Sequence, residues 1–450
     1  MRKHIIGYIT SKRRRNIYDV TQLFLLFLCC KAATEIKQAA GQGNDVELVQ
    51  RCFNALYNST PTTFGSFMTS SPVSLNISRV WRSAKEWPFP LTVFSTATMD
   101  RVHHLESLCQ MLPGSAVSAA VYLPLVQPHG VFLLPRNEAL VQETQAKLQE
   151  VFNRLEFSND TCSLRMLLLS EVVADRALAS LVPINALRNA ALLAIRTPLA
   201  AMIDVDLAIS DSLKSILADP NKVQAMQQAA TSFWVLPAWE SESHLKQQDA
   251  QNTVLSAIKG DKQRLAMLWQ SRHLRMFSED VFPQGHNATD YRRWLSAEQP
   301  YAVRYARGYE PWGITTRERY MVMPYDIRFR GCFRDKVTQV ASLAYINTSF
   351  AAIPDAWLVH QPHKLSAAAS IAFGHTGKRS NRVEALQQWL RVQALHKVVF
   401  YRGINTTKFM LHKAHSLVTS DDAMGAMAAG RYQPIVGLQF RSCRDSLPWF

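Results

Sequence analysis

The amino-acid sequence predicts an α/β fold, in which helices cover a largely parallel sheet. A strand, a helix and a second strand follow one another within about thirty residues after Leu91, which is how parallel sheets commonly open. A short apolar run at Pro198–Leu207, opened by proline, is typical of a strand buried on both faces. The 48% hydrophobic content and the ten tryptophans among 450 residues indicate a folded globular body.

The predicted elements alternate between strand and helix in the first part of this body. In order they are strand 91–96, helix 99–111, strand 116–123, helix 137–155, strand 165–169, helix 183–195 and strand 198–203. The turn 96–101 joins the first strand to its helix, a position at which nucleotides commonly dock. This turn lacks the GxGxxG pattern, so a dinucleotide site is not indicated.

Beyond residue 203 the pattern is less regular. An apolar run at 233–238 precedes polar, helix-prone sequence at 240–275, which we interpret as an excursion from the sheet, either a lid or an acceptor-side insertion. An aromatic and basic tract follows, whose rings either stack on sugars or pack in a core. These rings belong to Tyr291, Trp294, Tyr301, Tyr305, Tyr309 and Trp312. A helix at 337–345 and a β-like run at 351–359 complete the interpretable part.

Two acidic residues, Asp204 and Asp206, end the strand predicted at 198–203. Because side chains alternate faces along a strand, both carboxylates are expected on the same side. Like charges this close repel one another unless a cation or a proton lies between them. A hard divalent cation prefers oxygen ligands and could hold a diphosphate at this sheet edge. Aspartates after a strand also commonly cap a helix or lie solvated, so the pattern alone leaves both interpretations open.

Further polar residues stand at positions that suit a site. Arg188 and Asn189 lie in the early turns of a helix, where a guanidinium could meet phosphate or a sugar carboxylate, or form an ordinary salt bridge. Asp335 precedes the helix at 337–345, where it could act as a general base or favour the helix dipole. His360 follows the β-like run and could complete an oxygen-rich metal site or be structural.

The N-terminus predicts entry into the secretory pathway. A basic segment precedes an apolar run that is shorter than the roughly 20 residues of a comfortable membrane span. Such a run suits a signal peptide or a short signal anchor, and the positive charge keeps its N-terminal side in the cytosol. The expected organisation is a cytosolic basic tail at 1–19, a signal anchor or signal peptide at 20–33, a stem at 34–86 and a single catalytic domain at 87–450.

Glycosylation sequons support a luminal body because they are spread along the chain after the apolar run. They occur at Asn58, Asn76, Asn159, Asn287, Asn347 and Asn405. The cysteines show no CxxC spacing, which argues against a thiolate metal site, and their pairing does not follow from sequence. The formal charge of +15 is carried by scattered cations without a nucleic-acid motif, so we expect no nucleic-acid partner.

Taken in order, colinear blocks between about Pro90 and His363 resemble the glycosyl-transferase for dystroglycan family (glycosyltransferase family 49). This family includes the LARGE xylosyl/glucuronyltransferases and the β-1,4-glucuronyltransferase of dystroglycan. The most specific block reads Pro-Ile-Asn-Ala-Leu-Arg-Asn and is followed by Ile-Asp-Val-Asp. The resembling blocks are 96–106, 183–206, 236–240, 289–312, 325–336 and 358–363. The tail at 367–450 is an extension without a counterpart.

The resemblance implies a GT-A fold with a Rossmann-like nucleotide-sugar-binding sheet. It further implies an inverting, metal-dependent glycosyltransferase of the Golgi membrane with a luminal catalytic domain. The donor is a UDP-sugar, with glucuronic acid favoured and xylose as the alternative, and the acceptor is a glycan or glycoprotein. A catalytically inactive glycan-binding protein on the same fold is the competing interpretation.

The resemblance also assigns roles by position. Asp204, Asp206 and His360 would hold Mn²⁺, with Asp204 facing the UDP diphosphate. The residues expected around the nucleotide and donor are Thr96, Asp100, Arg101, Arg188 and Asn189. An inverting enzyme needs a carboxylate that takes the proton of the acceptor hydroxyl. Asp335 is the first candidate for this base and Glu310 the second.

Overall fold

The computed structural model describes residues 48–49, 61–70, 73–130, 132–364 and 408–449. The chain divides into two compact units, Met1–Arg51 and Cys52–Phe450, and every element named below belongs to the second. Within the described ranges, no helix combines the length and apolar character needed to cross a membrane. The anchor expected at 20–33 lies outside these ranges.

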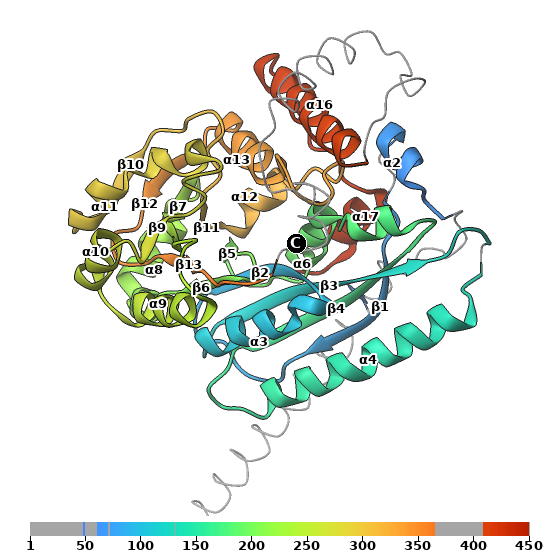
Figure 1. The fold of residues 1–450 in the computed structure, drawn as a ribbon, viewed down its shortest axis with the longest axis horizontal. Coiled ribbons are helices and arrows are strands. Elements are labelled where there is room, and N and C mark those ends of the chain that lie inside the picture. The colour runs from blue at the N-terminus through green and yellow to red at the C-terminus, as the bar shows by residue number, and fades with distance from the viewer. Residues whose placement is uncertain (1–47, 50–60, 71–72, 131, 365–407, 450) are drawn as a thin grey trace, which may run out of the picture. The chain divides into compact units, whose positions relative to one another are not determined.

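A nine-stranded sheet forms the centre of the second unit (Figure 1). Across the sheet, the strands are β1 (Asn76–Arg82), β4 (Ser163–Val173), β3 (Ala116–Val126), β2 (Leu91–Thr98), β5 (Leu199–Met202), β11 (Trp312–Thr316), β7 (Ser232–Leu236), β12 (Ser349–Ala352) and β10 (Tyr301–Val303). Strands β4, β3, β2 and β5 run parallel, whereas β11 runs antiparallel to both β5 and β7. The predicted α/β class is confirmed, with a sheet that is mixed rather than wholly parallel.

Helices cover both faces of the parallel strands (Figure 1). Helices α3 (Val102–Met111) and α4 (Pro135–Glu156) pack on one face of the sheet, and α6 (Ile184–Leu193) packs on the other. This change of face is expected, because crossovers between parallel strands are right-handed and the strand order reverses direction after β4. Helix α6 is buried on every side, so its polar side chains must find partners inside the protein. The expected stem contributes β1, which pairs with β4, so the sheet begins before the boundary expected at residue 87.

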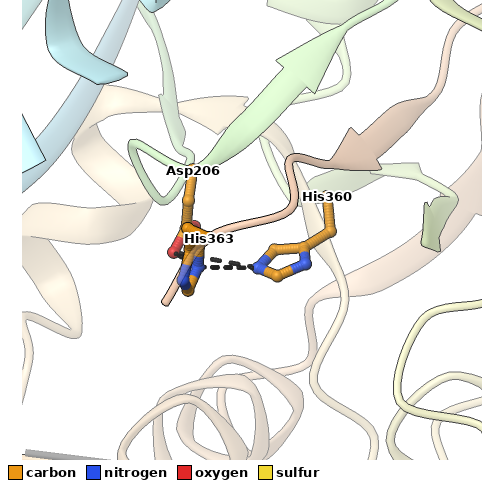
Figure 2. Close-up of side chains that lie close together, drawn as sticks. All are labelled: Asp206, His360 and His363. Atoms are coloured by element: carbon orange, nitrogen blue, oxygen red, sulfur yellow. Dashed lines mark hydrogen bonds and ion pairs between the residues drawn. The ribbon is translucent and has the colours of Figure 1, made fainter. Parts of the chain in front are cut away.

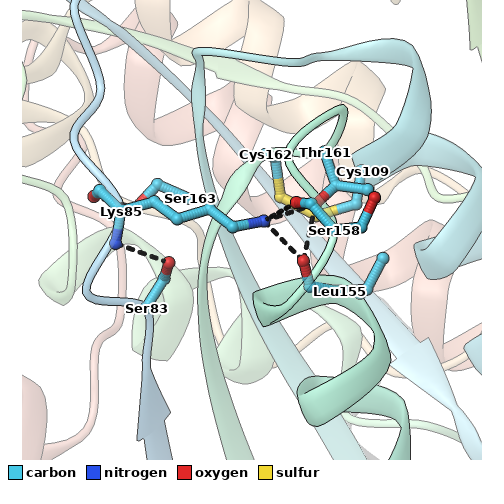
Figure 3. The surroundings of a disulfide bond; sticks show 8 residues. All are labelled: Ser83, Lys85, Cys109, Leu155, Ser158, Thr161, Cys162 and Ser163. Atoms are coloured by element: carbon cyan, nitrogen blue, oxygen red, sulfur yellow. Dashed lines mark hydrogen bonds between the residues drawn. A yellow bond between two sulfur atoms is a disulfide. The ribbon is translucent and has the colours of Figure 1, made fainter.

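A disulfide bond joins the end of α3 to the start of β4 through Cys109 and Cys162 (Figure 3). Beside it, the Lys85 ammonium donates to the carbonyl oxygens of Leu155 and Ser158, at 2.5 Å each. Carbonyl groups at a helix C-terminus lack partners within the helix. Lys85 therefore supplies hydrogen bonds at the end of α4 and ties the segment after β1 to the first half of the sheet.

A second, four-stranded sheet is built from short strands that are interleaved in the chain order with those of the large sheet. Its strands are β6 (Leu207–Ile209), β13 (Leu358–His360), β8 (Ala238–Ser241) and β9 (Leu274–Met276). Helices α9 (Gln247–Lys259) and α10 (Lys262–Gln270) pack against it, so the predicted excursion at 240–275 forms a helical cover for this sheet. The single β-like run predicted at 351–359 is wrong, because Pro354 lies in a turn that separates β12 from β13, and these strands belong to different sheets.

Most rings of the aromatic tract form core rather than a sugar-stacking surface. Five of the six are at most 8% exposed, namely Tyr291, Trp294, Tyr301, Tyr309 and Trp312. The Trp239 ring contacts both Tyr291 and Trp294 at centroid distances of 4.8 and 6.1 Å. Tyr305 differs because it is only partly buried.

Shorter elements and the C-terminal extension complete the unit. The remaining helices are α2 (Phe64–Ser70), η1 (Met99–Arg101), α5 (Arg176–Ser180), α7 (Ser212–Ala218), α8 (Pro220–Gln228), η2 (Pro283–Gly285), η3 (Asn287–Thr289), α11 (Tyr291–Ser296), α12 (Arg317–Val322), α13 (Asp335–Tyr345), α16 (Lys408–Ala428) and α17 (Leu438–Ser446). In the extension, α16 packs against α13 and α17 packs against α6. The extension is therefore part of the folded body.

Candidate active site

The two acidic residues of the predicted site lie in the connection between β5 and β6. The Leu207 amide donates to the Asp204 carbonyl at 3.0 Å, which makes this connection a tight turn. Strand β5 belongs to the large sheet and β6 to the small one, so the turn lies where the chain passes from one sheet to the other. Asp204 and Asp206 thus project from the carboxyl end of a central strand, the edge at which open α/β sheets bind ligands.

Asp206 meets two histidines from the end of β13 (Figure 2). The antiparallel register pairs His360 with Leu207, which places the histidine beside the acid. The Asp206 Oδ2 lies 2.9 Å from the His363 Nε2 and 3.9 Å from the His360 Nε2. The two Nε2 atoms are 3.1 Å apart, so one carboxylate and two imidazoles converge on a single point.

The hydrogen bonds of His363 favour a cation at this point. Its Nδ1 lies 2.9 Å from the carbonyl oxygen of Lys364, which can only accept, so Nδ1 carries a proton. The Nε2 faces the Asp206 carboxylate at 2.9 Å, so either a proton on Nε2 or a metal ion lies between these two atoms. A carboxylate with two imidazoles is a donor set that fits a divalent metal, and the bonded Nδ1 orients the ring as in known metal sites.

Charges around this cluster keep it ready to bind a cation. Burial opposes ionisation of Asp206, but the hydrogen bond from His363 and the nearby His360 and Arg101 outweigh it, so the pKa of Asp206 lies well below its usual value. Burial lowers the pKa of His360, which favours the neutral ring that a metal requires. His363 was not among the ligands predicted from sequence, although it lies three residues after His360 in the same loop.

Asp204, in contrast, is held by cations. Its Oδ1 accepts from the Arg188 Nη2 at 3.1 Å, and its Oδ2 accepts from the Lys336 Nζ at 3.1 Å. The Trp312 indole also donates to Oδ2, at 3.3 Å. Burial raises the pKa of Asp204, but Lys336 and Arg188 outweigh burial and lower it overall. The role of Asp204 as a metal ligand stays a prediction.

Arg188 links Asp204 to Asp335. Its Nη1 donates to the Asp335 Oδ2 at 2.5 Å and to the Asn185 Oδ1 at 3.0 Å. Because α6 is fully buried, this guanidinium crosses the core to reach both carboxylates. The role of Arg188 in donor binding stays a prediction, since these contacts occupy both of its terminal nitrogens.

Asn189 binds the backbone of Tyr325 through both ends of its side-chain amide. Its side-chain amide donates to the Tyr325 carbonyl at 2.8 Å, and its oxygen accepts from the Tyr325 amide at 2.9 Å. It thereby fixes the start of the loop that leads to Asp335. A contact with the nucleotide, as the resemblance implies, stays a prediction.

The loop between Tyr325 and Asp335 is strained and firmly anchored. Phe333 and Arg334 have φ angles of 87° and 64°, in the left-handed region that side chains with a Cβ disfavour. Such strain persists only where the surroundings hold the backbone, and it concentrates at functional sites. The anchor is Arg330, whose guanidinium pairs with both carboxylate oxygens of Glu171 at 2.7 and 2.8 Å in the core.

Glu310 lies just before β11, on the same side as Asp204. Its side chain is partly exposed. The surrounding groups still exclude enough water to raise its pKa to about 7, although the positive charge of Lys336 acts to lower it. A carboxylate whose pKa lies near neutrality is suited to accept a proton. The role of Glu310 or Asp335 as the catalytic base stays a prediction.

Three of the five residues predicted around the nucleotide and donor lie at the end of β2 or just after it. Thr96 is buried within that strand, and Asp100 is exposed beside Arg101. The Arg101 Nη2 donates to the Lys364 carbonyl at 2.7 Å, which brings this arginine to the loop of His360 and His363. The roles of all three residues in nucleotide binding stay predictions.

Comparisons with known proteins agree with the resemblance. The family model described as glycosyl-transferase for dystroglycan matches residues 90–389. Mouse "Xylosyl- and glucuronyltransferase LARGE2" is 28% identical over 301 residues, which cover 67% of this chain and 38% of that protein. Human "Xylosyl- and glucuronyltransferase LARGE1" is 25% identical over 293 residues, covering 65% of this chain and 33% of that protein. The chain thus spans about a third of the length of these relatives.

Structural comparison adds little. A crystal structure of S. aureus TarS residues 1–349 aligns with 76% of this chain and 92% of that one, at a TM-score of 0.29 and 10% identity. A likeness this weak carries no argument about the site. The family model, in contrast, matches two thirds of the sequence and includes every predicted site residue. The chain therefore belongs to the glycosyl-transferase for dystroglycan family.

Proposed function

We propose that this protein is an inverting, metal-dependent glycosyltransferase that moves a sugar from a UDP-sugar to a glycan acceptor. Glucuronic acid is the favoured sugar and xylose the alternative, in keeping with the names of the relatives. The observation that carries the proposal is the convergence of Asp206, His360 and His363 at the carboxyl end of β5, beside Asp204 and Glu310.

The chemistry follows from the two sides of the site. A Mn²⁺ ion held by Asp206, His360 and His363 would stabilise the charge on the departing diphosphate. Glu310 takes the proton of the acceptor hydroxyl. At the same time, the oxygen of that hydroxyl bonds to the anomeric carbon, and the bond from that carbon to the UDP oxygen breaks. We assign this proton transfer to Glu310 rather than Asp335, because the Arg188 Nη1 donates to the Asp335 Oδ2 at 2.5 Å and so occupies that oxygen.

We further propose a luminal location at the Golgi membrane. Support comes from three sequon asparagines that are exposed, Asn159, Asn287 and Asn347. The Cys109–Cys162 disulfide supports it as well, because such bonds persist in oxidising compartments. Attached glycans at these asparagines in protein secreted from cells would test the location.

The activity is tested with the purified full chain and a panel of UDP-sugars. We expect release of UDP from one donor in the presence of Mn²⁺, and loss of this release with EDTA. Asp206→Asn should abolish it, whereas Asp211→Asn, an exposed acid paired with Lys214, should retain it. If Asp206→Asn released UDP as fast as the parent protein, the proposed mechanism would be wrong. Glycan binding that is indifferent to UDP and Mn²⁺ would instead support a non-catalytic binding protein.

A further inference from the structure

A groove of about 970 Å³ lies between α16 and the segment 282–308. This volume is at the upper end of the range for small-molecule sites. Its lining includes Phe282, Tyr305, Arg307, Arg334, Asp421 and Met424. Gly308 also lines it, two residues before Glu310, and Arg334 directly precedes Asp335. Neither Glu310 nor Asp335 lines the groove, but each lies within two residues of a lining residue along the chain.

We propose that this groove binds the acceptor glycan and that α16 determines which acceptor binds. The inference rests on the proposed transfer reaction and assigns a role to a helix outside the matched region. The family match ends at residue 389, whereas α16 spans Lys408–Ala428. In this proposal, Asp421 and Met424 of α16 are the specificity-determining residues.

The chemistry of the lining suits pyranose sugars. Phe282 and Tyr305 offer aromatic surface to the apolar faces of sugar rings, and the Tyr305 ring is itself supported by Phe350 at a centroid distance of 6.1 Å. Arg307 and Asp421 are both exposed at the groove. A guanidinium donates and a carboxylate accepts hydrogen bonds, so the pair can bind the hydroxyl groups that distinguish one sugar from another.

Helix α16 is held firmly enough to act as a wall. The hydroxyls of Ser420 and Thr338 share a hydrogen bond of 3.2 Å, and both residues are at most 3% exposed. The buried His412 ring donates from Nε2 to the Arg330 carbonyl at 2.7 Å. Because Asp421 follows Ser420 directly, these contacts fix it relative to α13 and to the strained loop.

The strained loop belongs to the same structure. The Arg334 backbone is held at a φ of 64°, and its guanidinium lies over the Phe282 ring at 5.9 Å. The Lys413 ammonium of α16 lies 5.5 Å from the Phe333 ring centre. Loop, groove and α16 thus form one connected unit, in which an acceptor held by α16 has a defined position relative to Glu310.

The test uses the full chain with the p-nitrophenyl β-D-glycosides of xylose, glucose, galactose and glucuronic acid as acceptors. UDP release without acceptor is measured first, because it reports on the proposed function alone. For the glycoside that accepts sugar, we expect Asp421→Ala and Tyr305→Ala to raise the acceptor KM by about 10-fold or more relative to the KM for the UDP-sugar. Asp422→Ala is the matched control, since this exposed neighbour on α16 does not line the groove.

Each outcome decides the inference. If the parent protein transfers sugar and the groove variants keep its acceptor KM, the inference is overturned while the proposed function stands. If the parent protein releases no UDP from any donor, the proposed function fails, and calorimetry with the same glycosides then tests the groove directly. Binding that is lost in Asp421→Ala but kept in Asp422→Ala supports the groove, whereas no binding, or binding equal in all variants, overturns it.

Discussion

Two carboxylates that lie two residues apart have opposite surroundings in this protein. Asp206 faces the imidazole nitrogens of His360 and His363, whereas Asp204 faces the positive charges of Arg188 and Lys336. The first arrangement attracts a metal cation. In the second, positively charged side chains already occupy the place of such a cation. The sequence pattern Asp-Val-Asp does not distinguish the two acids, but the residues around them in the structure do. The predictions below test this difference.

The largest effect is expected for Asp206→Asn. Removing this charge takes away the carboxylate of the metal cluster, and metal ions contribute several kcal/mol to such reactions, so UDP release should fall by about 10³-fold or more. The measurement is UDP release against Mn²⁺ concentration, with binding followed by calorimetry. A variant that keeps both the rate and the Mn²⁺ requirement would remove the distinction between the two acids.

The next largest effect is expected for Glu310→Gln, on the Asp204 side. Loss of a general base should lower kcat by about 100-fold or more. Because the base works as a carboxylate and burial raises its pKa to about 7, kcat of the parent protein should increase as pH rises through about 7. This rise of kcat with pH should disappear in the variant. If the rise persisted in Glu310→Gln but was absent in Asp335→Asn, Asp335 would be the general base.

A stability measurement controls for unfolding in that variant. The folded state binds the Glu310 proton more tightly than the unfolded chain does, because the pKa is raised from 4.5 to about 7. Stability from this group is therefore present below about pH 4.5 and is lost as the pH rises to 7. Glu310→Gln removes this loss, so its Tm at pH 8 should equal or exceed that of the parent protein. A lower Tm would mean that its inactivity reflects folding.

A smaller effect is expected for His363→Ala. Losing one of three converging donors should weaken Mn²⁺ binding by about 10- to 100-fold, and excess Mn²⁺ should restore part of the rate. The control is His273→Ala, since His273 is exposed and the described hydrogen bonds of its ring go only to Ser271. Unchanged Mn²⁺ affinity in His363→Ala would limit the cluster to Asp206 and His360.

The smallest effect on metal affinity is expected for Asp204→Asn. Arg188 and Lys336 already neutralise this carboxylate, so without nucleotide the Mn²⁺ affinity should change by less than about tenfold. The same titration with UDP present shows whether Asp204 joins the metal once a diphosphate is bound. A loss of affinity equal to that of Asp206→Asn would mean that both acids are metal ligands from the start.

The sequence predicted the first half of the fold well, because its elements are long and regular. Strand β3 and helix α4 run over Ala116–Val126 and Pro135–Glu156, and their apolar periodicity is plain in the sequence. The second sheet was missed because strands such as β6 and β9 have three residues each, too few for a periodic pattern. The run predicted at 351–359 failed for this reason too, since it merged two short strands.

The candidate site divides in the same way. Asp206 and His360 were predicted because each follows a run that could be recognised as a strand. Lys336 was not, because its contact with Asp204 joins residues 132 positions apart, and such a distance leaves no local signal. His363 lies only three residues after His360 in the chain, yet the fold of the loop after β13 is needed to show that its ring turns back to Asp206.

Helix α6 has a practical consequence for any mutational study of this family member. It presents Asn185, Arg188 and Asn189 to partners deep inside the protein, where no solvent can replace a lost contact. A substitution at any of them leaves a polar group without a partner, so the chain loses stability in the same step as it loses activity. An inactive Arg188 variant therefore says nothing about sugar transfer until its melting curve has been recorded.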